Sequence, residues 1–230
     1  HQSWGVAVSP TQARLQIRAF RRVLLPFPLY HYAGFFILAV TLLSGGMVIL
    51  MDRPNPRLML EIIQKEKITQ LTGSPTIFHF LLGMSDIESY DLSSVMRVAF
   101  STEPVSLELC SQLHERFKCP LENIYGLTEA RIISWTGLND PWERSATSIG
   151  RPVPGVEVCI VDDRRHPLRS GESGEIAVHS PQMMSGYLND SDLTAQVIDD
   201  DGWFYTGDFG WLGEDGYLHL IDRKSDMIIR

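Results

Sequence analysis

Residues 95–129, VMRVAFSTEPVSLELCSQLHERFKCPLENIYGLTE, decide the fold of this chain. They begin with an apolar run, Val95 to Phe100, that is typical of a buried strand. Ser106 can then cap a helix that carries an apolar side chain at every fourth position over residues 109–117. A second strand is predicted over Glu122 to Tyr125. The order strand, helix, strand predicts two parallel strands joined by a helix that covers the sheet.

The same alternation fills the chain before this stretch. Further strands are predicted over Val23 to Phe27, Met47 to Met51 and Ile68 to Thr72. Helices are predicted between and after them, over Phe35 to Leu43, over Pro56 to Lys67, and from Pro75 behind an N-cap at Ser74. We therefore predict an α/β fold with a mostly parallel sheet covered by helices.

After about Ser148 the pattern changes to short strands separated by Gly and Pro. The strands are predicted over Val156 to Val161, Gly174 to His179, Trp203 to Asp208, Phe209 to Leu212 and Tyr217 to Ile221, with a hairpin turn at Glu214 to Gly216. We expect residues 1–148 to form the α/β part of one large domain and residues 149–221 a small β-rich subdomain of it. Residues 222–230 are expected to begin a hinge.

Composition limits the possible functions. The 230 residues are 44% hydrophobic and 21% charged, which is ordinary for a globular protein. A net charge of -8 with no run of Lys or Arg argues against a nucleic-acid partner. Cys110, Cys119 and Cys159 form no Cys-x-x-Cys pair, and their odd number cannot all pair within the chain. Reduced thiols and a cytoplasmic location are therefore expected.

One uncharged segment reaches the lower length limit of a membrane-spanning helix. Residues 34–51 carry no charge over eighteen positions, but Ser44-Gly45-Gly46 interrupts them. A helix, a turn and a buried strand explain the same residues, so no membrane span is predicted. The histidines have no metal-ligand spacing, so no zinc site is predicted either.

Two short motifs carry the groups that a nucleotide site needs. In Tyr125-Gly126-Leu127-Thr128-Glu129 the ring can stack on a purine, the hydroxyl can donate to a phosphate oxygen, and the carboxylate can hold Mg²⁺. In Tyr205-Thr206-Gly207-Asp208 the carboxylate can accept hydrogen bonds from ribose hydroxyls, and Arg223 can add a positive charge nearby. The order of these groups along the chain predicts half of an ATP site.

Each of these residues also has a structural alternative. Glu129 could be a solvated loop carboxylate, Tyr125 a core tyrosine, Asp208 part of a Gly-Asp turn, and Arg223 a surface partner of Asp222 or Asp226.

The ordered motifs resemble the adenylate-forming superfamily, which includes acyl-CoA synthetases, firefly luciferase and peptide-synthetase adenylation domains. The similarity rests on Pro28 to Gly34 (an aromatic-His gate), Tyr125 to Glu129, Gly174-Glu175-Ile176 with Gly186-Tyr187 and Thr194, Tyr205 to Asp208, and Asp222-Arg223 with Asp226 to Ile229. Ser148 to Gly155 looks like the connecting segment of the acyl-CoA synthetase branch. The resemblance extends over the chain from about Arg22 onward.

The resemblance implies a set of site residues. Those expected to bind ATP or AMP are Thr102, Glu103, Pro104, Tyr125, Gly126, Leu127, Thr128, Asp208 and Arg223. Thr128, Glu129 and His31 are expected to act in catalysis, with Glu129 as the Mg²⁺ ligand. His31 could equally be a structural histidine between Tyr30 and Tyr32.

The resemblance also implies two half-reactions. A carboxylic acid reacts with ATP to give acyl-AMP and pyrophosphate, and coenzyme A then takes the acyl group. The implied partners are thus a small carboxylate, ATP and CoA. A carrier-protein thiol as the acceptor, or a noncatalytic nucleotide-binding protein, are the alternatives.

The sequence departs from the family pattern at several positions. The adenine-side glycines of the family are replaced in Ser101-Thr102-Glu103-Pro104, which narrows the freedom of the backbone there. Ser225 stands where the hinge usually has Asp or Lys. The family's Pro-Lys-Gly phosphate loop and its C-terminal lysine have no counterpart in these 230 residues, which alone are expected to be inactive in ATP–pyrophosphate exchange.

Overall fold

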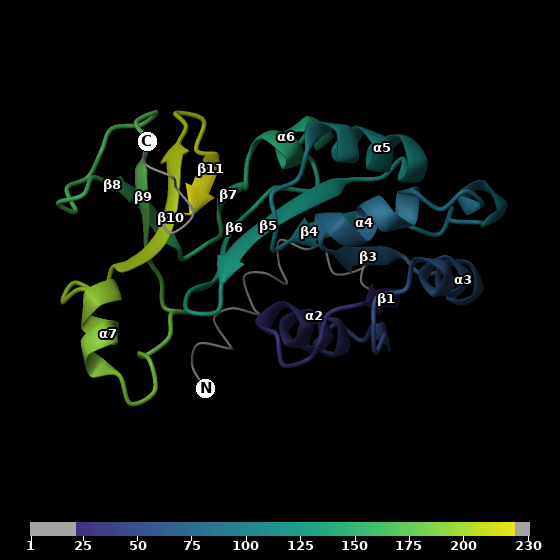
Figure 1. Ribbon diagram of the computed structural model, residues 1–230, viewed down its shortest axis with the longest axis horizontal. Coiled ribbons are helices and arrows are strands. Elements are labelled where there is room, and N and C mark those ends of the chain that lie inside the picture. Colours follow the sequence, from purple (N-terminus) through teal and green to yellow (C-terminus); the bar gives the residue numbers. More distant parts are fainter. Residues whose placement is uncertain (1–21, 224–230) are drawn as a thin grey trace. The chain divides into compact units, whose positions relative to one another are not determined.

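The computed structural model describes residues 22–223, which form two units (Figure 1). The helical unit consists of residues 22–124 and Thr136–Thr147. The strand-rich unit consists of Tyr125–Trp135 and residues 148–223. The two units are described in turn.

A parallel sheet forms the centre of the helical unit. Its strands are β1 (Arg22–Leu25), β2 (Met47–Leu50), β3 (Gln70–Gly73), β4 (Arg97–Ser101) and β5 (Leu121–Leu127). They lie in the order β2-β1-β3-β4-β5, and each neighbouring pair is parallel. The predicted α/β fold is therefore confirmed. Strand β5 carries the chain from the helical unit into the strand-rich unit.

Helices connect these strands as the sequence predicts. They are α2 (Tyr32–Leu43), α3 (Pro56–Glu66), α4 (Pro75–Leu82) and α5 (Leu107–Phe117), with a 3-10 helix at Ile87–Ser89. A further short helix, α6 (Trp142–Thr147), follows later in the chain. The two predicted serine caps are confirmed. Ser74 accepts from the backbone N–H of Ile77 at 3.4 Å, and Ser106 accepts from that of Leu109 at 3.1 Å.

Three of the helices cover one side of the sheet. The main core cluster takes its buried side chains from strands and from α3, α4 and α5, among them Leu71, Val98, Met59, Phe78 and Leu109. Helix α2 adds no buried residue to this cluster. In Figure 1, α2 and α5 lie on opposite sides of the strands.

A buried ion pair links β4 and β5 within this unit. Arg97 is 1% exposed and Glu122 is 2% exposed. The guanidinium donates two hydrogen bonds to Oε2 of Glu122, the one from Nε at 2.6 Å. Both charges are thus compensated within the sheet.

Antiparallel strands dominate the strand-rich unit. Strands β6 (Arg131–Trp135) and β7 (Arg151–Pro152) pair antiparallel at the end of the first sheet. A second sheet has the order β11-β10-β9-β8, formed by β8 (Glu157–Val161), β9 (Gly174–His179), β10 (Phe204–Leu212) and β11 (Leu218–Arg223). Helix α7 (Ser191–Val197) precedes β10.

Several expectations for this region need correction. The two strands predicted over 203–208 and 209–212 are one strand, β10, because a bulge lets its hydrogen bonding continue past Gly207. Strands β6 and β7 and helices α6 and α7 were not predicted. Asp222 and Arg223 belong to β11, and the rest of the expected hinge lies outside the described residues. Within residues 22–223, no helix has the length and apolar character needed to cross a membrane.

Candidate nucleotide site

The hairpin of β5 and β6 presents the first motif. Thr128, Glu129 and Ala130 form its turn, and Arg131 closes it at a φ of 65°. A Cβ on Gly126 would lie 2.1 Å from the carbonyl oxygen of Arg131, so only glycine fits where the two strands approach. The hairpin buries the side chain of Tyr125, leaves Glu129 half-buried and exposes Thr128.

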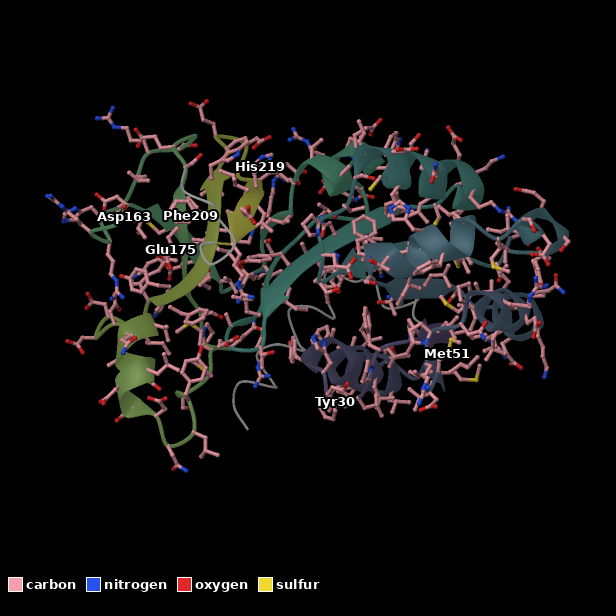
Figure 2. All side chains as sticks on the ribbon, viewed as in Figure 1. Tyr30, Met51, Asp163, Glu175, Phe209 and His219 are labelled. Atoms are coloured by element: carbon pink, nitrogen blue, oxygen red, sulfur yellow. The ribbon has the colours of Figure 1, made fainter. Side chains whose placement is uncertain are left out.

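A bulge in β10 presents the second motif. The pairing of β10 with β9 shifts register between Tyr205 and Phe209. Thr206 donates its hydroxyl to the carbonyl oxygen of Ile176 at 2.8 Å and accepts from the N–H of Asp208 at 3.0 Å. The N–H of Gly207, at a φ of 75°, donates to Oε1 of Glu175, which is labelled in Figure 2, at 3.0 Å. These bonds fix the bulge and turn Asp208 into the unit.

Asp208 meets two partners at the bulge. The phenol of Tyr125 donates to Oδ2 of Asp208 at 2.6 Å, and Nε of Arg223 lies 3.5 Å from Oδ1. Burial, which leaves Asp208 6% exposed, is the main reason that its pKa is raised above the ordinary 3.8. Tyr125 and Arg223 oppose this rise, whereas the negative charges of Glu175 and Glu129 add to it. Burial and Asp208 also raise the pKa of Tyr125 well above 10.0, so this phenol remains a donor at neutral pH.

Glu129 is held at two points. Its carboxylate Oε1 accepts from the phenol of Tyr187 at 3.1 Å, and its backbone carbonyl accepts from the N–H of Met184 at 2.7 Å. Its other oxygen, Oε2, accepts no hydrogen bond from the part of the chain that the structure describes. One carboxylate oxygen is thus fixed by the protein, and the other is available to a ligand.

The donor set suits Mg²⁺ that arrives with a nucleotide. Mg²⁺ prefers oxygen ligands and is commonly held by one or two carboxylates together with substrate phosphates. The carboxylate of Glu129 provides such an oxygen, and the exposed hydroxyl of Thr128 can donate to a phosphate oxygen. Between residues 22 and 223 there is no group of three or more His, Cys, Asp and Glu side chains that could hold a metal ion by itself. Glu129 therefore fits a shared ion better than a resident one.

His31 belongs to the helical unit. It is exposed and caps helix α2, because its Nδ1 accepts from the N–H of Ala33 at 3.2 Å. Its ring also stacks on Phe27 with the ring centres 6.4 Å apart. The cap gives His31 a structural role.

The predicted residues Thr102, Glu103 and Pro104 follow strand β4 in the same unit, and all three are exposed. Thr102 has a φ of 79°, a left-handed conformation that is unfavourable for a β-branched residue. Oε2 of Glu103 accepts from the hydroxyl and the N–H of Thr76 at 2.6 and 3.3 Å. Glu103 therefore interacts with the first turn of α4, where a negative charge is favourable.

The structure brings one group of predicted residues together. Tyr125, Glu129, Asp208 and Arg223 share direct contacts or charge interactions in the strand-rich unit, with Gly126, Leu127 and Thr128 in the same hairpin. Sequence reasoning gave no role to Glu175, Thr206 and Tyr187, which support this group. All three belong to motifs that carry the family resemblance, which is the sequence signal that could have identified them. The order of residues along the chain does not reveal which carboxylate a phenol contacts.

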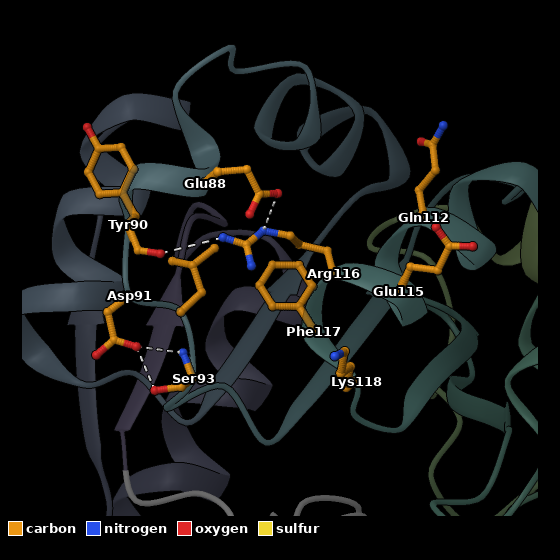
Figure 3. Close-up of a pocket in the computed structure, with 10 residues that line it drawn as sticks. Glu88, Tyr90, Asp91, Ser93, Gln112, Glu115, Arg116, Phe117 and Lys118 are labelled. Atoms are coloured by element: carbon orange, nitrogen blue, oxygen red, sulfur yellow. Dashed lines mark hydrogen bonds and ion pairs between the residues drawn. The ribbon is translucent and has the colours of Figure 1, made fainter.

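The helical unit also has a surface hollow, shown in Figure 3. Ten residues from Glu88 to Lys118 line it, and none of them is a predicted site residue. Arg116 crosses the hollow, donates to the carbonyl oxygen of Ile87 at 3.0 Å and lies 3.6 Å from Glu88. The charge of Arg116 is therefore used in internal contacts.

Comparisons with known proteins identify the family of this chain. Residues 3–188 match the model of a family described as AMP-binding enzyme. A medium/long-chain-fatty-acid–CoA ligase of Mycobacterium tuberculosis, FadD8, is 32% identical over 229 residues, which are 99% of this chain and 40% of that protein.

Solved structures give the same result. The amide bond synthetase McbA from Marinactinospora thermotolerans has a TM-score of 0.89 and 35% identity, over 99% of this chain and 46% of its own. The O-succinylbenzoate coenzyme A synthetase MenE from Bacillus subtilis, in complex with ATP and magnesium ion, has a TM-score of 0.86 and 27% identity, over the same 99% and 46%. The chain thus spans less than half the length of each of these proteins. Because the family model covers most of its residues, this chain belongs to the AMP-binding enzyme family, as its resemblance to adenylate-forming enzymes predicts.

Proposed function

We propose that the full-length protein activates a carboxylic acid with ATP and transfers the acyl group to coenzyme A. The observation that carries this proposal is the pair of carboxylates in the strand-rich unit. Asp208 is buried and anchored by two partners, whereas Glu129 keeps one carboxylate oxygen available. Ribose hydroxyls and a phosphate-bound Mg²⁺ are the ligands that these two environments suit.

Asp208 would accept hydrogen bonds from the ribose. A carboxylate has about four lone-pair positions, so the hydrogen bond from Tyr125 and the ion pair with Arg223 leave acceptor capacity for two hydroxyls. The ring of Tyr125, whose phenol is anchored on Asp208, would stack on adenine. Gly126 and Leu127 would flank the base with their backbone. Arg223, with a 58% exposed side chain, would add positive charge beside the nucleotide.

Glu129 and Thr128 would act on the phosphates. The carboxylate oxygen of the acid attacks the α-phosphorus of ATP, the bond between the α-phosphorus and the bridging oxygen breaks, and pyrophosphate leaves. Glu129 would hold Mg²⁺, which neutralises charge on the phosphates, and Thr128 would donate to a phosphate oxygen as charge moves toward the leaving group.

The helical unit would supply the remaining groups. We assign Thr102, Glu103 and Pro104 to the adenine side and His31 to the mouth of the acyl pocket. These roles rest on the family resemblance. The cap on α2 and the bonds to Thr76 are structural roles that His31 and Glu103 have in any case.

Coenzyme A is the proposed acceptor. Its thiolate attacks the acyl carbon of acyl-AMP, and AMP leaves with the electrons of the mixed-anhydride bond. The support is the name of the similar fatty-acid–CoA ligase. Since the equally similar McbA is an amide bond synthetase, preformed acyl-AMP should be offered CoA, a carrier-protein thiol and an amine in parallel. Preferential formation of acyl-CoA is expected, and formation of another product in its place would reassign the second half-reaction.

The test of the first half-reaction is ATP–pyrophosphate exchange by the full-length protein with a panel of carboxylic acids. Glu129→Gln should lower the exchange rate about 100-fold, because it removes the carboxylate charge with little change of shape. Its binding of ATP in EDTA should equal that of the wild type. Wild-type exchange by Glu129→Gln would refute the metal role, and absence of exchange with every acid in the wild type would refute adenylation.

A further inference from the structure

The segment Gly186-Tyr187 with Thr194 has no role in the function proposed above. The first turn of α7 fixes its backbone. The N–H of Tyr187 donates to Oγ1 of Thr194 at 2.9 Å, and that hydroxyl donates to the carbonyl oxygen of Asp190 at 2.8 Å. Asp190 in turn caps α7 through the N–H of Leu193 at 2.9 Å.

Glycine at position 186 lets the chain turn toward the hairpin. Gly186 has a φ of 145°, and a Cβ at this position would meet Thr194 at 3.0 Å. The turn points the phenol of Tyr187 at Glu129, and both residues belong to the strand-rich unit. The phenol and the Met184 N–H hold the side chain and the backbone of Glu129 from the same loop.

We propose that Tyr187 is a positioning residue for Glu129, which it holds in the orientation that presents the other carboxylate oxygen to Mg²⁺. This inference rests on the proposed function, because it assumes that Glu129 is the metal ligand. The free carboxylate could otherwise rotate about its side-chain torsions and would lose conformational entropy on binding the ion. Tyr187 removes that loss in advance, as outer hydrogen-bond partners do for the ligands of metal sites.

The same unit contains a matched phenol–carboxylate pair, Tyr205 and Asp199, which is separate from the pair of Tyr187 and Glu129. The phenol of Tyr205 donates to Oδ2 of Asp199 at 2.6 Å, and the guanidinium of Arg165 lies 3.9 Å above its ring. Asp199 also accepts from the N–H groups of Asp201 and Trp203 at 3.1 and 2.9 Å, so this bond stabilises a turn. Tyr205→Phe therefore deletes the same kind of phenol–carboxylate bond without touching Glu129.

The experiment measures ATP binding by isothermal titration calorimetry on the full-length protein, in EDTA and in saturating Mg²⁺. The ratio of the two affinities is the metal-dependent gain. Tyr187→Phe should reduce this gain about tenfold and leave the affinity in EDTA unchanged, because the phenol acts on the metal ligand and on no nucleotide group. Tyr205→Phe should leave the gain at the wild-type value. Far-ultraviolet circular dichroism and the thermal midpoint establish that each variant is folded.

A double-mutant cycle separates positioning from a general structural effect. In the Glu129→Gln background, Tyr187→Phe should have no further effect on the metal-dependent gain. An unchanged gain in Tyr187→Phe, or an equal additional loss in the Glu129→Gln background, would overturn the positioning role while leaving adenylation intact. A wild-type protein that binds no ATP would instead refute the proposed function, and this inference with it.

Discussion

Two buried carboxylates show the difference between a structural group and a candidate binding group in this molecule. Glu122, in the helical unit, is 2% exposed and faces the equally buried guanidinium of Arg97. Asp208, in the strand-rich unit, is 6% exposed, but its cationic partner Arg223 has a 58% exposed side chain and lies 3.5 Å away. The first charge is fully compensated at close range, and the second is not.

The comparison shows which of the two carboxylates can still accept hydrogen bonds from a ligand. A buried carboxylate whose charge is fully compensated contributes to the fold, but it has little remaining capacity to accept hydrogen bonds from a ligand. Asp208 is buried at an energetic cost, which its raised pKa reports, and Glu175 and Glu129 increase that cost. Raised pKa values of this kind are common at functional sites, where a ligand completes the interactions that the protein leaves open.

The largest effect is expected for Arg97→Met. This change leaves the buried carboxylate of Glu122 without its cation, and it should lower the free energy of unfolding by about 3–5 kcal/mol. Denaturant unfolding of the full-length protein measures the loss. The double variant Arg97→Met/Glu122→Leu should recover most of it, because both charges are then replaced by apolar groups. If the double variant is no more stable than Arg97→Met, the charge pair is not the cause.

Asp208→Asn should have opposite effects on binding and stability. It should weaken ATP binding about 10- to 100-fold, since ribose hydroxyls lose a charged acceptor. It should also raise the thermal midpoint at pH 7 by about 2 °C, because it removes a charge that is desolvated and repelled by Glu175 and Glu129. Calorimetric titration and thermal unfolding of the same preparation measure the two effects.

The pH dependence gives the control for that variant. The folded-state pKa of Asp208 lies above the unfolded value, so its stabilising contribution is complete below the unfolded pKa and is lost as the pH rises through the folded pKa. The stability advantage of Asp208→Asn should therefore be present at pH 7 and shrink toward pH 4. An advantage that stays constant over this range would exclude ionisation of Asp208 as its origin.

The smallest effect is expected for Thr102→Gly, in the helical unit. Because Thr102 is exposed and has a φ of 79°, glycine relieves backbone strain and removes few contacts. The net stabilisation should be about 0.5–1 kcal/mol after the added flexibility of the unfolded chain is included. Thr102→Ala is the matched control, since it keeps a Cβ and should gain less. A destabilised glycine variant would show that the threonine side chain contributes more than its conformation costs.

The sequence predicts the helical unit better than the strand-rich unit. In the helical unit the caps at Ser74 and Ser106 and the apolar periodicity are local signals, and local contacts realise them. In the strand-rich unit, β10 was expected as two strands, and β6 was not expected. The bulge at Gly207 depends on Glu175, and the β5–β6 hairpin depends on the close approach of Gly126 to Arg131. Such non-local partners leave no periodicity in the sequence.

The candidate site divides in the same way. Tyr125, Glu129, Asp208 and Arg223 can be selected from their motifs, because the chemistry of a nucleotide asks for an aromatic ring, oxygen ligands and a positive charge. The same motifs did not reveal that His31 caps α2 or that Glu103 contacts α4. His31 accepts from a backbone N–H, and Glu103 accepts from the hydroxyl and the N–H of Thr76. The motifs do not indicate that these donors lie within hydrogen-bond distance.

The sequence by itself determined the family and the α/β class, and it selected the motifs that we propose bind the nucleotide, because these depend on residue type, order and local periodicity. Only the tertiary structure decided that Tyr125 anchors Asp208 and that Tyr187 holds Glu129. These contacts join residues 83 and 58 positions apart in the chain. Their geometry is set by a glycine-dependent hairpin and a bulge, since a hydrogen bond requires that both partners meet within about 3 Å.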